Sequence, residues 1–94
     1  MPWSRAEHEI EVALRSPASL RVLRVLLRNR GKYVTKYFVS EETGIPNPSR
    51  IIESLVRLGW IEEQSIGGHR RYRINMENPK VKALHEFFTQ VGYL

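Results

Sequence analysis

The residues of this sequence best suited to chemistry are its arginines and lysines, and the chemistry they suit is anion binding. The chain carries 15 Lys and Arg against 10 acids, all of them Glu, and has a net charge of +5. No acid interrupts residues 12–40, and a second acid-free stretch covers residues 64–75. Clustered cations favour a polyanionic partner, with nucleic acid first, although a generic solvated basic surface has the same composition. The cations of the two stretches are Arg15, Arg21, Arg24, Arg28, Arg30, Lys32 and Lys36, then Arg70, Arg71 and Arg73.

Catalysis and metal binding find little support in the residue types. The sequence has no Cys and no Asp, which excludes disulfides, thiolate metal sites and cysteine nucleophiles. Its three histidines, His8, His69 and His85, include no closely spaced pair that would hold a metal. It contains no nucleophile elbow and no Gly-rich phosphate loop before a helix. We therefore expect no enzyme activity, no cofactor and no metal.

Helix-starting residues divide the chain into the short elements that must position these cations. Residues 4–7 form a capping box with Ser4 as the N-cap, and Ser16-Pro17 opens a second helix, which Gly31 ends. Residues 33–35 are β-prone but too short for an independent strand, which leaves a one-rung edge strand open. Thr35 or a neighbour then starts a short helix over residues 36–43. The triplet Gly44-Ile45-Pro46 then breaks the chain.

The second half of the chain continues the pattern. Asn47 as the N-cap and Pro48 at the first helical position predict a helix through Leu58. Residues 60–65 and 71–74 indicate two strands joined around Gly67-Gly68. Alternation turns Tyr72 and Ile74 inward and Arg71 and Arg73 to the other side, and Trp60 is expected in the core. Asn78-Pro79 opens a last helix.

Two short helices joined by a Gly-containing turn and followed by a hairpin resemble the winged helix-turn-helix of small prokaryotic transcription regulators, the ArsR-like and MarR-like ones in particular. The resemblance covers residues 17–75. It is carried by Thr43-Gly44-Ile45 leading into residues 48–58, by Leu58-Gly59-Trp60-Ile61, and by residues 68–74. It implies a mostly α fold with a small β-hairpin wing, of the α+β class, with extra N- and C-terminal helices. We expect one domain over residues 1–94: an N-terminal helix (1–16), the winged core (17–75) and a C-terminal dimerisation helix (76–94).

In such proteins the second helix of the unit enters the major groove and the wing contacts the backbone or minor groove. The resemblance therefore implies a recognition helix over residues 48–58 and a wing over residues 65–71. Alternatively, the charged helix face is a solvated surface of i, i+3 and i, i+4 pairs, and the hairpin is an ordinary one. The expected DNA contacts are Lys32, Lys36, Tyr37, Asn47, Ser49, Arg50, Glu53, Arg57, His69, Arg70, Arg71 and Arg73. The sequence assigns no role to Arg21, Arg24 and Arg28.

The terminal helices carry more apolar residues than a monomer of this size should expose. They either fold back onto their own core or form a two-fold dimer, as in the regulators that the chain resembles, with two recognition helices about 34 Å apart on a palindromic site. We expect the dimer, with an interface of Ile10, Leu14, Val81, Leu84, Phe87, Phe88 and Val91.

The function expected from the sequence is that of a sequence-specific regulator of transcription that binds double-stranded DNA. The alternatives are a winged-helix module for protein docking within a larger assembly, and a nonspecific nucleic-acid-binding protein. No apolar run approaches the roughly 20 residues of a membrane span, and the N-terminal residues lack the pattern of a signal peptide. We therefore expect a cytoplasmic, nucleoid-associated protein with no membrane partner; the operator and any small-molecule effector stay open.

Overall fold

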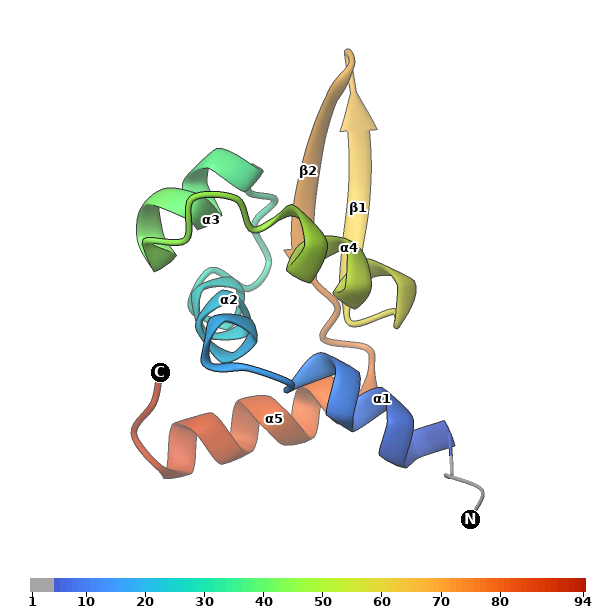
Figure 1. Cartoon of the computed structure of the whole chain (residues 1–94), viewed down its shortest axis with the longest axis vertical. Helices are drawn as coiled ribbons and strands as arrows, with labels where there is room; N and C mark the ends of the chain where they lie inside the picture. Colours follow the sequence, from blue (N-terminus) through green and yellow to red (C-terminus); the bar gives the residue numbers. More distant parts are fainter. Residues whose placement is uncertain (1–4) are drawn as a thin grey trace.

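Within the part of the chain that the structure describes, five helices and one antiparallel hairpin form a small α+β fold (Figure 1). This structure is a computed structural model and describes residues 5–94, with side chains from residue 8 onward. The predicted Ser4 cap lies outside the described residues. The elements in chain order are α1 (Arg5–Ala13), α2 (Pro17–Arg28), α3 (Lys36–Thr43), α4 (Ser49–Arg57), β1 (Ile61–Ile66), β2 (His69–Ile74) and α5 (Pro79–Gln90).

Side-chain caps start three of the helices where the sequence predicts them. The Ser16 hydroxyl accepts a hydrogen bond from the Ser19 N–H at 3.1 Å, ahead of α2. The Thr35 hydroxyl accepts from the Phe38 N–H at 3.1 Å, ahead of α3. Each cap satisfies a helix N–H that has no partner within the helix. The amide oxygen of Asn78 does the same for the Lys80 N–H at 2.9 Å, ahead of α5.

The start and end predicted for α4 are each wrong by one residue. Pro48, rather than Asn47, precedes the first helical residue, Ser49. The Asn47 side chain still supports this turn, because its amide oxygen accepts from the Ser49 N–H at 3.2 Å. The helix ends at Arg57, and Gly59 then reverses the chain with a φ of 80° that a glycine adopts without strain.

The hairpin is longer than predicted. The strands pair from Ile61 opposite Ile74 to Ile66 opposite His69, so that Gly67 and Gly68 alone form the turn. Both glycines have positive φ, 56° and 80°, as a two-residue turn of this hand requires. Residues 69 and 70, expected between the strands, therefore belong to β2.

A single antiparallel bridge joins the segment before α3 to the hairpin. Val34 and Tyr72 exchange two backbone hydrogen bonds of 2.8 Å, which confirms the one-rung edge strand that the sequence left open. Tyr72 and Ile74 are buried, as the alternation predicts. This bridge ties the segment before α3 to the base of the hairpin.

Helix α2 lies at the centre of the fold, with α3 and α4 on one side and α5 on the other (Figure 1). Its apolar face, Val22, Leu23 and Leu26, is fully buried. Ile52 and Leu55 of α4, Trp60, and Val81 of α5 belong to the same core cluster. Burial of these side chains holds the helices together, since no helix here is long enough to be stable alone.

The core corrects part of the predicted dimer interface. Val81, Leu84 and Phe88 are buried within the chain's own core, so their stripe on α5 faces α2 rather than a second copy. Leu14 is half-buried and packs on the same cluster. Of the predicted set, Ile10, Phe87 and Val91 remain exposed.

Candidate nucleic-acid interface

The turn between α3 and α4 is held by side-chain hydrogen bonds. Gly44 ends α3 in the left-handed region, with φ 76°. The Ser40 hydroxyl donates to the Ile45 carbonyl at 2.7 Å, and the Thr43 hydroxyl accepts from the Ile45 N–H at 3.2 Å. These bonds satisfy backbone groups that would otherwise lack partners, and they set how α4 leaves α3.

Helix α4 buries one face and exposes the other. Ile52 and Leu55 are 0% and 1% exposed, and this burial turns Arg50, Glu53 and Arg57 outward. No ion pair among the described side chains involves Arg50 or Arg57. The exposed face of α4 thus presents two guanidinium groups that form no ion pair with a carboxylate of the described residues.

The third charged residue of this face is already engaged. The Glu53 carboxylate lies 3.7 Å from the Lys36 ammonium, which links α4 to the start of α3. Lys36 also lies over the buried Tyr72 ring, 5.8 Å from its centroid. Both charges are partly exposed, so the pair is weak. Lys36 stays a predicted DNA contact, and Glu53 is its local counter-charge.

The hairpin carries a second group of cations. His69, Arg70 and Arg71 are exposed near its tip, as predicted. Arg70 forms a long cross-strand ion pair with Glu63 at 3.9 Å, between two exposed groups. Such a pair contributes about 0–1 kcal/mol and leaves the guanidinium accessible.

Arg73 departs from the prediction. Its guanidinium lies 3.4 Å from the Glu62 carboxylate and 4.5 Å from the centroid of the Tyr33 ring. The Arg73 side chain is half-buried, with Glu62 of β1 on one side and the segment before α3 on the other. Arg73 therefore braces the base of the hairpin, and its place as a DNA contact is not supported. The alternation of the sequence predicts which face of the sheet Arg73 lies on, but it does not predict that Glu62 and Tyr33 are its partners.

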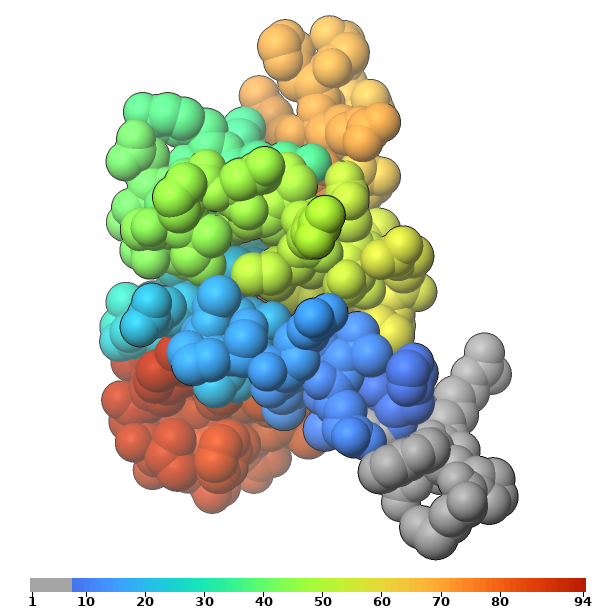
Figure 2. Space-filling model, in the orientation of Figure 1, coloured from blue at the N-terminus to red at the C-terminus, as the bar shows by residue number. Residues whose placement is uncertain are grey.

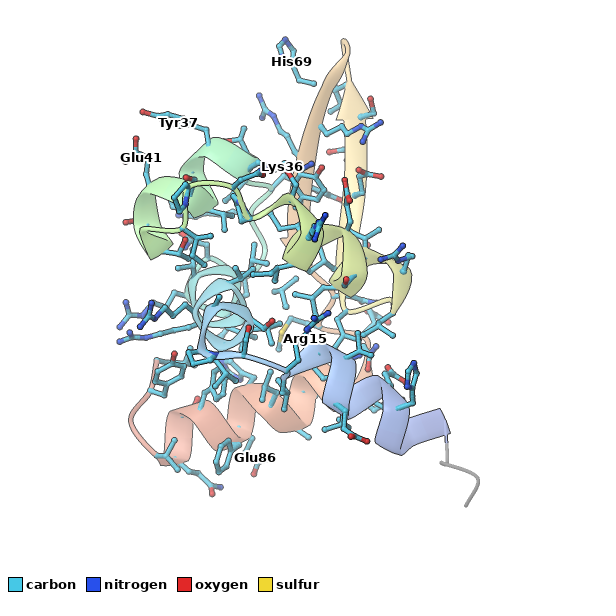
Figure 3. All side chains as sticks on the ribbon, in the orientation of Figure 1. Arg15, Lys36, Tyr37, Glu41, His69 and Glu86 are labelled. Atoms are coloured by element: carbon cyan, nitrogen blue, oxygen red, sulfur yellow. The ribbon has the colours of Figure 1, made fainter. Side chains whose placement is uncertain are left out.

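Two further predicted contacts lie around the start of α3. Lys32 is exposed in the turn after α2, with no ion pair among those of the described residues. Tyr37 is 70% exposed, and its hydrogen bond with Glu41 raises the pKa of the phenol above its usual value. Figure 3 shows Tyr37 and Glu41 projecting together from α3. The carboxylate competes with a phosphate for this hydroxyl, which makes Tyr37 a poorer candidate contact than Lys32.

Sequence reasoning missed Arg15, which the structure brings to the same surface. Arg15 lies between α1 and α2 and points toward α4 (Figure 3). It lines a groove of about 520 Å³ together with Arg50 and Arg57. Figure 2 shows the α1–α2 junction directly beneath α4, with the hairpin tip visible from the same side. The signal in the sequence was the acid-free stretch that contains Arg15, but spacing alone does not pair residues 15 and 50.

The arginines without an assigned role belong to a different groove. Arg21, Arg24 and Arg28 line it together with Glu42 of α3 and Tyr93 near the C-terminus. The Arg24 guanidinium stacks 4.7 Å above the Tyr93 ring centroid. This contact fastens the C-terminal residues to α2, while Arg21 and Arg28 are exposed.

Two further kinds of site to consider in the described residues are a metal cluster and a membrane-spanning helix. They contain no group of three or more His, Asp, Glu or Cys side chains placed to hold a metal. His85 instead accepts a hydrogen bond from the Arg30 guanidinium. Among the described residues, no helix has the length and apolar character that a membrane span requires.

Comparison with known proteins adds no relative to this description. No protein-family model matches the sequence, and no curated protein is similar enough to count as a match.

Proposed function

We propose that the chain is a winged helix-turn-helix protein that binds double-stranded DNA and regulates transcription. The observation that carries the proposal is the exposed face of α4. Arg50 and Arg57 on this face take part in no ion pair of the described side chains, and the hairpin beside it carries further exposed cations. A B-DNA major groove is about 12 Å wide and accepts one α-helix. The division of α4 into a buried face and an exposed, charged face supports such an insertion.

The two arginines of α4 take different roles in this proposal. Arg50 lies in the first turn of the helix, the part that reaches base edges, and its fork of donors matches the acceptors of guanine. Arg57 is the last residue of the helix and contacts a phosphate. Lys32, Lys36 and Arg71 supply further phosphate contacts, which set affinity rather than sequence preference.

The experiment that tests this proposal measures duplex binding by fluorescence anisotropy, after selection of preferred duplexes from a random pool. We expect the logarithm of the affinity to fall linearly with the logarithm of the salt concentration. Arg50→Ala should cost about 1–3 kcal/mol on the selected site and little on random duplex. Arg28→Ala is the matched control, because it removes the same charge from an exposed position outside the α4 face. It should change neither the affinity for the selected site nor the affinity for random duplex.

Each contrary outcome has a definite meaning. Absence of duplex binding at low salt, or binding insensitive to salt, contradicts the proposal and favours a protein-docking module. Equal losses for Arg50→Ala on selected and random duplexes make Arg50 a phosphate contact, and binding is then nonspecific at this position.

We also propose that two copies associate through the outer face of α5. Phe87 and Val91 lie one turn apart there and are 57% and 58% exposed. Phe87→Ser should give a folded monomer by sedimentation, because this ring lies outside the core, whereas the wild-type chain sediments as a dimer. Truncation before Val81 is unsuitable, because it removes core residues. A wild-type mass equal to that of one chain would contradict the dimer, and a dimeric Phe87→Ser would contradict the assignment of Phe87 to the interface.

A further inference from the structure

The groove between α4 and the α1–α2 junction concentrates positive charge from separate parts of the chain. Arg15 comes from the junction, and Arg50 and Arg57 come from the two ends of α4. The groove has a volume of about 520 Å³, and the three arginines are all exposed. Hydroxyl groups of Ser16 and Ser54 also line it. A cavity with several guanidinium groups and hydroxyl donors is suited to an oxyanion.

The charge in this groove is poorly compensated. Among the described residues that line the groove, Glu53 alone is acidic, and its carboxylate pairs with Lys36 on α3. No ion pair of the described side chains involves Arg15, Arg50 or Arg57. Three like charges around one cavity repel one another, and an anion that enters the cavity relieves this repulsion.

Helix α2 adds to the positive potential. Its first turn, which includes Ser19 of the groove lining, contains no acidic residue, so the positive end of its dipole has no side-chain counter-charge there. This contribution is secondary to the guanidinium groups, since a helix terminus carries a partial charge of about half a unit.

We propose that this groove is a phosphate-binding site, with Arg15 as the guanidinium that completes it. A phosphate can receive paired N–H donors from one arginine while a second arginine approaches from the opposite wall. The phosphate is either a phosphodiester of bound DNA or part of a small phosphorylated molecule. The DNA alternative rests on the proposed function, since the site then extends the α4 interface; the small-molecule alternative does not.

The test uses the full chain, the variant Arg15→Gln and the matched variant Arg28→Gln. Position 15 lies in a bend with an exposed side chain, and thermal unfolding of each variant checks that the fold is retained. In the DNA arm, the affinity for duplex is measured as a function of salt. In the second arm, inorganic pyrophosphate is titrated into DNA-free protein at constant ionic strength, and the arginine Nε–H resonances are followed by NMR.

If the phosphate belongs to DNA, Arg15→Gln should weaken duplex binding about three- to tenfold on every sequence and reduce the salt slope by about one. Arg28→Gln should leave the slope unchanged. If the phosphate belongs to a small molecule, pyrophosphate should shift the Arg15 resonance saturably, and Arg15→Gln should abolish saturable binding.

The two proposals can fail separately. The phosphate site is overturned, and the proposed function is not, if two results are found together. Arg15→Gln changes duplex binding no more than Arg28→Gln does, and the response to pyrophosphate is not saturable. Absence of duplex binding together with saturable, Arg15-dependent pyrophosphate binding overturns the proposed function and retains the site.

Discussion

Removal of the Glu9 carboxylate should destabilise the whole domain, because Glu9 joins three elements that are far apart in sequence. One of its oxygens accepts a hydrogen bond from the Trp60 indole N–H at 2.7 Å, and the other lies 2.8 Å from the Lys80 ammonium. The Trp60 side chain is 1% exposed, so no water can replace a lost acceptor without rearrangement. The Glu9 side chain is itself only 14% exposed. Helix α1 is thereby bound to the start of the hairpin and to α5.

The expected magnitude follows from these two contacts. A buried N–H left without an acceptor costs about 1–3 kcal/mol. Loss of the partner of the half-exposed Lys80 costs about 0.5–1 kcal/mol. Glu9→Ala should therefore lower the free energy of unfolding by about 1.5–4 kcal/mol, which for a domain of this size lowers Tm by at least about 6 °C. Glu9→Gln, which keeps an acceptor for the indole, should lose about 1 kcal/mol.

The assay is urea unfolding followed by far-UV circular dichroism, with the indole N–H resonance of Trp60 as a local reporter. Glu11→Ala is the control, because Glu11 lies on the same helix and is exposed; its effect should stay within about 0.5 kcal/mol. If Glu9→Ala costs no more than Glu11→Ala, the reasoning is refuted. Equal losses for Glu9→Ala and Glu9→Gln would assign the stabilisation to charge rather than to the indole hydrogen bond.

Two further predictions concern the hairpin turn and α3. Gly68→Ala should cost about 1–2 kcal/mol in urea unfolding, since φ is 80° there and an added Cβ meets no neighbouring atom, so backbone strain is the whole effect. Gly68→Asn should cost less, because Asn tolerates this region, and an equal loss would contradict the argument. Glu41→Gln should lower the pKa of Tyr37 toward its ordinary value of 10.0, because the carboxylate no longer favours the protonated phenol. NMR titration of ring-labelled tyrosine measures this shift, and an unchanged titration would show that Glu41 is not its cause.

Much of the local structure could be predicted from the sequence because it depends on neighbours a few residues apart. Ser16, Thr35 and Asn78 cap helices through hydrogen bonds to residues two or three positions away. The alternation around Tyr72 follows from the two-residue period of a strand. Errors occurred where short-range rules compete, as at Pro48, which suits both the first helical position and the position before it.

The candidate site could be predicted only in part. Arg50, Arg57 and Lys36 lie on elements that the sequence places correctly, and their exposure follows from the apolar face opposite them. The engagement of Arg73 by Glu62 and Tyr33 depends on the sheet register and on a segment distant in sequence. The same register brings Arg70 toward Glu63.

The sequence by itself determined the order of the elements, most of their caps and the uneven distribution of positive charge. Only the tertiary structure decided which charges share a surface: Arg15 joins Arg50 and Arg57 around one groove, and Arg24 stacks on Tyr93. It also decided that the apolar stripe of α5 around Val81 covers the chain's own core. The reason is physical. Hydrogen-bonded caps and periodic patterns depend on residues a few positions apart. Charge clusters and buried faces arise from packing between segments that are far apart in the sequence, and short-range patterns do not predict which segments meet.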